Sequence, residues 1–226
     1  MSKNIVITGT SSGIGLELTK FFIKNKHHVL AISRNNSVLR NLNLKGLYAI
    51  DFDITNFQKY DLLNKYLNNF ENVDVLINNA GLLINRPFEE TSLEDFQKVY
   101  STNVFSVAML TKFLIKRMNN KSNVVNISSV GGVEGTLKFS GLSAYSSSKG
   151  ALNILTEMLA EEYKEYGIHF NSLALGSVQT KMLKKAFPGF QASTSAKDMA
   201  KHIYNFAMEG YKLINGKVIS ISSTTP

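Results

Sequence analysis

The chain has 226 residues, of which 44% are hydrophobic and 19% are charged, and its formal net charge is +8. This length suits one domain with a substantial core, and the composition is that of a globular protein rather than a disordered one. Cysteine is absent, which excludes disulfides, thiol nucleophiles and cysteine-bound metals. No apolar run is long enough to cross a bilayer or to form a secretion signal, so we expect a cytoplasmic protein.

The positive charge raises the question of nucleic-acid binding, because clustered Lys and Arg side chains attract phosphates. The lysines are scattered along the sequence, so we attribute the charge to a compositional bias towards Lys and Asn. We expect neither a nucleic-acid partner nor a membrane partner. The four histidines show no spacing typical of a metal site, and we expect no metal: His27, His28, His169 and His202.

Short β-branched runs alternate with amphipathic segments along the chain. Strands are predicted at residues 4–8, 28–33, 47–52, 73–78, 123–128, 169–174 and 217–222. Helices are predicted over residues 13–26, 56–70, 92–118, 143–166 and 196–209, with only one or two turns within 35–44. This alternation predicts a doubly wound, Rossmann-type α/β fold, with a seven-stranded parallel sheet and helices on both faces. No Pro- or Gly-rich linker divides the chain, so we expect a single domain over residues 1–226.

A glycine-rich turn follows the first predicted strand directly, with the sequence TGTSSGIG over residues 8–15. Glycines permit a tight turn and a close approach of the backbone to a pyrophosphate, and the following helix supplies free N–H groups. The spacing is G-x-x-x-G-x-G rather than the G-x-G-x-x-G of the older dinucleotide fingerprint. On its own, the turn is compatible with a dinucleotide site and also with the alternative of a plain tight turn.

Three further motifs follow in order: DIT at residues 53–55, NNAG at 78–81 and YSSSK at 145–149. Together with the turn, they resemble the short-chain dehydrogenase/reductase family over essentially the whole chain. The resemblance implies a nicotinamide cofactor, with hydride transfer between that cofactor and a small carbonyl or alcohol substrate. It also implies a homodimer or homotetramer built on the helices around 92–118 and 143–166.

Tyr145 and Lys149 lie four residues apart in a predicted helix, so their side chains emerge on one face. A phenol with its ordinary pKa of ~10 is a poor proton shuttle at neutral pH. We expect the nearby ammonium to lower that pKa, as an oxidised nicotinamide also would. Without the other motifs, a solvated helix face would be the simpler explanation of this pair.

The family resemblance implies roles for four residues. Tyr145 is the implied general acid and base, and Lys149 the residue that holds the nicotinamide ribose. Ser129, rather than Ser128, is implied to bind the substrate carbonyl oxygen, and Asn103 to help hold a water beside the lysine. This complete set argues against a non-catalytic NADP-binding scaffold or redox sensor, which needs the pocket but no proton relay.

The choice of cofactor depends on the end of the second strand, where Ser33 and Arg34 stand in place of a carboxylate. A carboxylate would bind the ribose hydroxyls and repel a 2′-phosphate, whereas Arg offers a planar fork of donors and a permanent charge. We therefore expect NADP(H) to be preferred over NAD(H), with a merely solvated Arg34 as the alternative. The residues predicted to bind the cofactor are Gly9, Ser11, Ser12, Gly13, Ile14, Gly15, Ser33, Arg34, Asp53, Ile54, Asn79, Ala80, Gly81, Tyr145, Lys149, Gly176, Val178 and Thr180.

The substrate side departs from the family pattern. The segment between Ser129 and Tyr145 is longer than usual, Leu175 replaces a common Pro, and the substrate loop over 181–196 is short. Several apolar residues are candidates for a substrate pocket, with core or interface roles as the alternative: Leu83, Leu137, Phe139, Met182, Leu183, Phe187 and Phe190. These patterns leave the substrate, the physiological direction and the choice between dimer and tetramer undetermined.

One alternative keeps the fold but makes the protein a 3-oxoacyl-[acyl-carrier] reductase. Lys116, Arg117 and Lys121 would then face an acidic carrier protein. Three basic residues at the end of a helix also complement its dipole, which is the simpler explanation. Dependence on an acyl-carrier thioester rather than a free ketone would distinguish the two enzymes.

Overall fold

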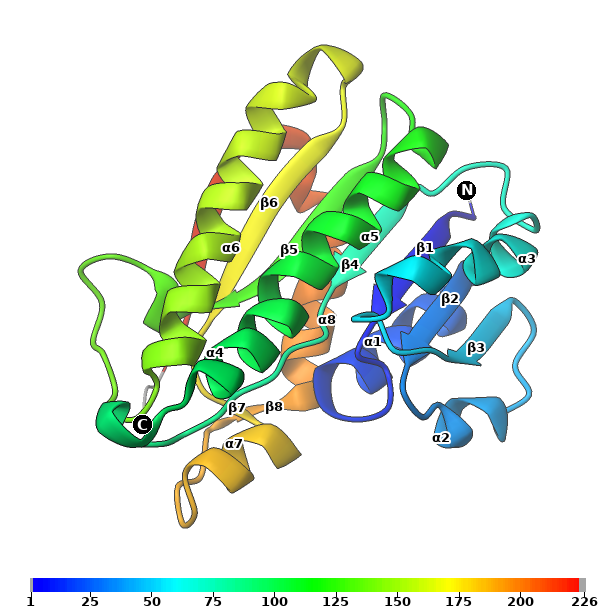
Figure 1. Ribbon diagram of the computed structural model, residues 1–226. Helices are drawn as coiled ribbons and strands as arrows, with labels where there is room; N and C mark the ends of the chain where they lie inside the picture. Colours follow the sequence, from blue (N-terminus) through cyan, green and yellow to red (C-terminus); the bar gives the residue numbers. More distant parts are fainter. Residues whose placement is uncertain (1, 224–226) are drawn as a thin grey trace.

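In the computed structural model, which describes residues 2–223, the centre of the protein is a seven-stranded parallel sheet (Figure 1). Its strands lie in the order β3-β2-β1-β4-β5-β6-β9, and every neighbouring pair is parallel. The chain steps outward from β1 to β3 and then returns to place β4 on the other side of β1, which is the doubly wound arrangement that the sequence predicts. The strands are β1 (Asn4–Thr8), β2 (His28–Ser33), β3 (Leu47–Asp51), β4 (Val75–Asn78), β5 (Asn123–Ser129), β6 (His169–Leu175) and β9 (Lys217–Ile221).

Helices cover both faces of this sheet. Helices α1 (Gly13–Lys24) and α8 (Ala196–Met208) pack on one face, and α4 (Leu93–Tyr100), α5 (Ser106–Leu114) and α6 (Ser143–Glu162) lie on the other (Figure 1). Alternating strand residues point to opposite faces, so Ile5 and Ile7 join the core under α1 and α8 while Val6 joins the core on the other side. The central strands β2, β1, β4, β5 and β6 are buried on both faces, which explains their largely apolar sequences.

The predicted strands agree with the structure to within one or two residues at their ends, but three predicted helices are interrupted. The helix predicted over 143–166 ends at Glu162 and is followed by a 3-10 helix (Lys164–Tyr166). The segment predicted as one helix over 56–70 is a 3-10 helix (Phe57–Leu63) followed by the single turn α3 (Asn64–Leu67). The helix predicted over 92–118 contains a π-helical turn (Ser101–Phe105) between α4 and α5. Near the end of the chain, the short strands β7 (Val178–Gln179) and β8 (Thr194–Ser195) form a small parallel pair that the sequence analysis missed.

The carboxyl ends of the parallel strands meet at one edge of the sheet, the lower edge in Figure 1. The glycine-rich turn follows β1, Asn79 follows β4, Ser129 ends β5 and Gly176 follows β6. The single turn α2 (Ser37–Arg40) follows β2, as predicted, and α7 (Lys181–Ala186) follows β7. Within the described chain, no helix combines the length and apolar character needed to cross a bilayer.

Candidate functional site

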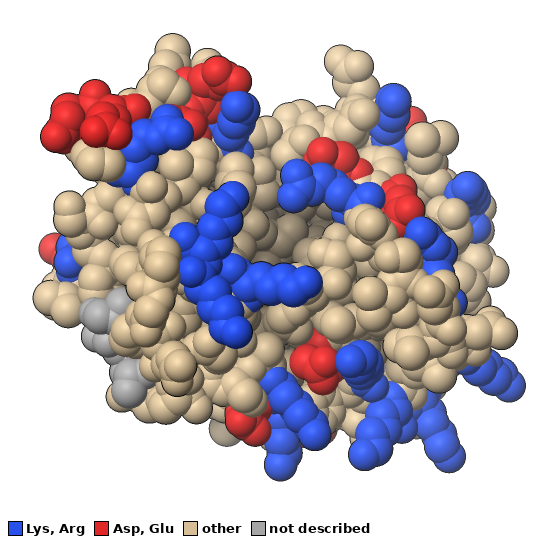
Figure 2. Space-filling view, turned by 90° about the horizontal axis from the view of Figure 1, so that it is seen from below, with Lys and Arg blue, Asp and Glu red and all other residues tan. Residues whose placement is uncertain are grey.

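A cavity of about 1030 Å³ opens at this edge of the sheet. Its volume lies at the upper end of the roughly 300–1,000 Å³ of small-molecule sites. Figure 2 looks onto this edge and shows a central hollow with Lys and Arg side chains on its rim. All of the predicted site residues except Gly15 and Asn103 line the cavity. Among residues 2–223, no group of three or more His, Asp or Glu side chains is arranged to hold a metal ion.

The glycine-rich turn is held against the segment that follows β4. The Thr8 hydroxyl oxygen accepts hydrogen bonds from the backbone N–H of Asn79 at 3.1 Å and of Ala80 at 3.0 Å. The Asn79 amide in turn donates to the carbonyls of Thr8 (2.9 Å) and Gly9 (3.1 Å). Gly9 has a φ of +73°, and a Cβ there would lie 2.7 Å from Cα of Ala80. Only glycine therefore fits this position.

Gly15 lies outside the cavity wall and has a packing role. A Cβ on Gly15 would overlap the carbonyl oxygen of Gly9, so the absence of a side chain lets α1 start directly beneath the turn. This contact places the first backbone N–H groups of α1 at the cavity, where a helix N-terminus favours an anion. The turn thus has the form of a phosphate cradle.

Asn36 is a buried residue of this region that the sequence analysis missed. Its amide donates to the carbonyls of Ala31 (3.0 Å) and Ile50 (2.7 Å), and its Oδ1 accepts from the Thr10 hydroxyl at 2.8 Å. One side chain thereby joins the glycine-rich turn to β2 and β3. An Asn shortly after a buried strand is the only signal in the sequence, and it does not identify these partners.

Arg34 stands at the end of β2 with its side chain exposed at the cavity wall. None of the described carboxylates forms an ion pair with it, whereas Arg40 pairs with Asp51. Asp53, on the same side of the cavity, accepts hydrogen bonds from the backbone N–H and the hydroxyl of Thr55. Among the described residues, the guanidinium of Arg34 is therefore a cation without an ion-pair partner at this end of the cavity.

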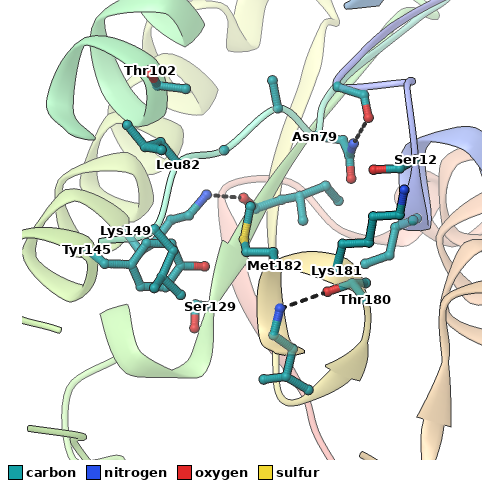
Figure 3. A pocket seen from close by; sticks show the side chains of 18 of the residues that line it. Ser12, Asn79, Leu82, Thr102, Ser129, Tyr145, Lys149, Thr180, Lys181 and Met182 are labelled. Atoms are coloured by element: carbon teal, nitrogen blue, oxygen red, sulfur yellow. Dashed lines mark hydrogen bonds between the residues drawn. The ribbon is translucent and has the colours of Figure 1, made fainter. Parts of the chain in front are cut away.

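Tyr145 and Lys149 lie on the same wall of the cavity near the start of α6 (Figure 3). The Lys149 Nζ is 5.7 Å from the centre of the Tyr145 ring and donates a hydrogen bond of 2.8 Å to the Ile127 carbonyl. Lys149 is only 4% exposed. The spacing of four residues therefore brings the two groups together, and the fold buries the amine.

The pKa values of this pair depend mainly on burial. Burial raises the pKa of the Tyr145 phenol to about 12, against a smaller lowering by its hydrogen bond with Ser129. Burial also lowers the pKa of the Lys149 amine to about 8. The prediction that Lys149 lowers the pKa of Tyr145 is thus wrong for the protein's own groups, because desolvation dominates. At neutral pH, Tyr145 is a neutral phenol and Lys149 is largely protonated.

A chain of buried polar side chains fixes α6 against the sheet. The Asn126 amide, on β5, donates to the Thr156 hydroxyl of α6 at 2.9 Å and accepts from the Asn78 amide at 2.8 Å. The Ser128 hydroxyl donates to the backbone carbonyl of Lys149 at 3.2 Å. A buried polar group that loses its hydrogen bond costs free energy, so these bonds fix the position of α6 relative to β5. They set the positions of Tyr145 and Lys149.

Asn103 lies in the π-helical turn and is fully buried. Its Oδ1 accepts from the Leu82 N–H at 2.8 Å, and its amide donates to the Leu82 carbonyl at 3.0 Å and to the Ser148 hydroxyl at 2.9 Å. The side chain joins the segment after β4 to α6. A role in holding a water beside Lys149 stays a prediction.

The substrate side of the cavity is apolar. Ser129 ends β5 near the Tyr145 hydroxyl (Figure 3), and its Oγ accepts from the Gly131 N–H at 3.2 Å. Phe139 and Phe187 pack edge to face with ring centres 6.1 Å apart, which joins the segment 133–142 to the end of α7. Of the predicted apolar residues, Leu83, Phe139, Met182, Leu183 and Phe187 line the cavity, whereas Leu137 and Phe190 do not.

Asn85 and Arg86 bind the two segments that form the substrate side, the end of α7 and the segment 133–142. The sequence analysis identified neither residue. The Asn85 amide donates to the Ala186 carbonyl at the end of α7 at 2.7 Å. The Arg86 N–H donates to the Gly141 carbonyl at 2.9 Å. Two neighbouring residues thus link segments that are far apart in the sequence.

The chain is similar in sequence and in structure to known oxidoreductases. A family model described as short chain dehydrogenase matches residues 3–190. The Uncharacterized oxidoreductase YusZ of Bacillus subtilis is 30% identical over 228 residues, which cover 96% of this chain and 80% of the relative.

Two solved structures give a TM-score of 0.86 with this chain. ElxO with NADP bound is 31% identical, and the match covers 98% of this chain and 97% of that one. 4-Hydroxyisoleucine dehydrogenase complexed with NADH is 26% identical, with coverage of 98% and 97%. One of these structural neighbours therefore binds NADP and the other binds NADH.

The burial of Lys149 predicts that Lys149→Met stabilises the protein at pH 7, raising the melting temperature by about 2–6 °C. Below the folded pKa of about 8, the buried ammonium opposes folding. Between pH 8 and the ordinary value of 10.5, the folded protein releases this proton first, so the stability of the unaltered protein rises with pH and the advantage of Met shrinks. Thermal unfolding at pH 7 and pH 10 measures both effects.

Lys184→Met is the matched control, because Lys184 is exposed on α7 outside the cavity. It should leave the melting temperature nearly unchanged at both pH values. A lower melting temperature for Lys149→Met at pH 7, or a difference that does not depend on pH, would contradict the buried ammonium.

Proposed function

We propose, from the premise that this chain belongs to the short-chain dehydrogenase/reductase family, that it is an NADPH-dependent reductase of a ketone or aldehyde. As a member of the family, the chain is an NAD(P)-dependent oxidoreductase. The observation that carries the proposal is the position of Tyr145, Ser129 and Lys149 on one wall of a cavity whose far end is the glycine-rich turn. In the opposite direction, the same site would oxidise a secondary or primary alcohol.

The residues present fit a nicotinamide dinucleotide. The turn at Gly9, where a Cβ has no room, offers the pyrophosphate a close approach to the backbone. Arg34 and Asp53 line the cavity where the adenosine would lie, and the family resemblance implies that Thr180 and Val178, which also line it, meet the nicotinamide. When bound, the reduced nicotinamide supplies the hydride, while the protein supplies position and protons.

Tyr145 is the proposed proton donor in the direction of reduction. As a neutral phenol, it donates its proton to the carbonyl oxygen of the substrate while the carbonyl carbon takes up hydride. Ser129 donates a hydrogen bond to the same oxygen, and Lys149 holds the ribose hydroxyls. In the oxidation direction, the positive charge of the oxidised ring favours the phenolate form of Tyr145, so Tyr145 accepts the proton.

Tyr145→Phe should reduce turnover by about 10²–10⁴-fold or more, because Phe keeps the ring but has no proton to transfer. Cofactor affinity should change little. The decrease in NADPH absorbance with a panel of ketones and aldehydes measures turnover, and NADPH fluorescence measures binding. Tyr166→Phe, at an exposed tyrosine, is the matched control and should keep full activity. Near-normal turnover by Tyr145→Phe would refute the role.

The preference for NADP(H) rests on Arg34. Its guanidinium is exposed, faces the cavity and has no ion-pair partner among the described residues. A 2′-phosphate at the end of β2 would meet a planar set of donors with a permanent charge. Ser33, at the last position of β2, adds a small hydroxyl where a carboxylate would repel that phosphate.

Arg34→Asp should therefore raise KM for NADPH by at least about tenfold, because a carboxylate repels the 2′-phosphate. KM for NADH should stay the same or fall. Arg40→Ala serves as the control, since Arg40 pairs with Asp51 and does not line the cavity. If the unaltered enzyme prefers NADH, or if Arg34→Asp leaves the ratio of the two KM values unchanged, the assignment is wrong.

For the alternative of a 3-oxoacyl-[acyl-carrier] reductase, Lys116, Arg117 and Lys121 would have to bind the carrier protein close to the cavity. Arg117 donates to the Asn64 and Asn68 side chains, and its carbonyl accepts from Val73 just before β4 begins. These basic residues therefore lie at the opposite edge of the sheet from the cavity. Thioester and free-ketone substrates compared under the same conditions distinguish the two reductases, and the absence of turnover with any carbonyl would favour the redox sensor.

A homodimer or homotetramer is supported by apolar side chains on α5, α6 and the π-helical turn. Ile154 and Met158, one turn apart on α6, are 61% and 60% exposed, and Phe105 and Met109 are 50% and 38% exposed. Val107 and Leu110, on the same helix as Met109, instead pack inside the subunit. Light scattering should report a mass of two or four chains, and a monomer mass would exclude the assembly.

The proposed partners are otherwise a small carbonyl or alcohol substrate and the nicotinamide cofactor, with no metal, nucleic acid or membrane. We propose a cytoplasmic location, where the NADPH pool is available to the enzyme. Fractionation of cells that carry the protein tests the location, and recovery in the membrane or secreted fraction would contradict it.

A further inference from the structure

One cation at the cavity has no place in the proposed chemistry. Lys181 is the first residue of α7, directly after Thr180, and lines the cavity. Figure 3 shows its side chain extending towards Ser12 in the glycine-rich turn and away from Tyr145 and Lys149. A second observation supports this proximity, because a Cβ on Gly13 would lie 3.3 Å from Cγ2 of Thr180. The start of α7 therefore lies against the start of α1.

The charge of Lys181 is uncompensated in the part of the chain that the structure describes. Lys20, Lys98 and Lys212 each form an ion pair with a glutamate, and Lys181 forms none. The first turn of α1 has no acidic residue, and α7 has the sequence KMLKKA. The gap between the two helices thus combines an ammonium with the partial positive charge of the N-terminus of α1. Such a gap suits a group with two negative charges.

We infer that Lys181 binds the pyrophosphate of the dinucleotide, from the side opposite to the glycine-rich turn. This inference rests on the proposed function, because it needs a dinucleotide in the cavity. The backbone N–H groups of the turn meet the phosphates from one side, and the ammonium of Lys181 meets them from the other. Neither the motifs nor the predicted cofactor residues included Lys181.

The ion pair between Lys181 and the pyrophosphate would also connect the cofactor to the substrate side of the cavity. Met182 and Leu183 follow Lys181 on α7 and line the cavity next to the reacting groups. The far end of α7 is held by Asn85 through the Ala186 carbonyl. A phosphate that pairs with Lys181 therefore fixes the start of a helix that carries part of the substrate wall.

The test compares Lys181→Met with Lys184→Met, which removes a cation from the same helix but outside the cavity. Fluorescence titration gives Kd for NADPH and for NADH at low and at high salt. Lys181→Met should raise both Kd values by the same factor, about tenfold at low salt and less at high salt, because both cofactors contain the pyrophosphate. Lys184→Met should change either Kd less than twofold, and Lys181→Arg should restore most of the affinity.

Arg34→Ala provides the contrasting result, since it should weaken NADPH binding and leave NADH binding unchanged. Three results would overturn the inference: no change in Kd for Lys181→Met, a loss confined to NADPH, or an equal loss for Lys184→Met. If the unaltered chain binds neither dinucleotide, the proposed function fails before any variant is compared. Normal binding by the unaltered chain and by Lys181→Met contradicts only the role of Lys181.

Discussion

The burial of the Lys149 amine is the interaction on which the site depends. An ammonium taken out of water is costly unless polar groups surround it, and here the Ile127 carbonyl accepts its hydrogen bond at 2.8 Å. Hydrogen bonds of Asn126 and Ser128 hold α6 against β5, which keeps the amine within reach of that carbonyl. The same packing places Tyr145 at the cavity and desolvates its phenol, so that one arrangement sets both the geometry and the protonation of the site.

The sequence predicts those parts of the molecule that depend on local patterns. Apolar runs mark the strands, the glycine spacing marks the turn after β1, and the YSSSK motif places Tyr145 and Lys149 on one helical face. The sequence does not predict the contacts of Asn85 and Asn36, because each side chain joins segments that meet only in the folded chain. Asn85, for example, binds a carbonyl 101 residues away. The π-helical turn at Asn103 likewise depends on its contacts with Leu82 and Ser148.

Electrostatics show the same difference between pattern and fold. A spacing of four residues predicts that Lys149 and Tyr145 share a face but not how deeply that face is buried, and burial dominates both pKa values. Lysines that are scattered in the sequence gather around the hollow at the edge of the sheet (Figure 2). Among them, Lys181 is distinguished only by the contact between α7 and the glycine-rich turn. Function therefore resides in where the fold places ordinary side chains.

The most direct test of this account is the ionisation of Tyr145 itself. Ultraviolet difference absorbance near the phenolate band, for the unaltered protein minus Tyr145→Phe, follows this one phenol as pH is raised. Without cofactor, burial should keep Tyr145 neutral up to pH 10. With saturating NADP⁺, the positive ring should bring ionisation to a lower pH. Ionisation below pH 9 without cofactor, or a midpoint that NADP⁺ does not move, would contradict the account.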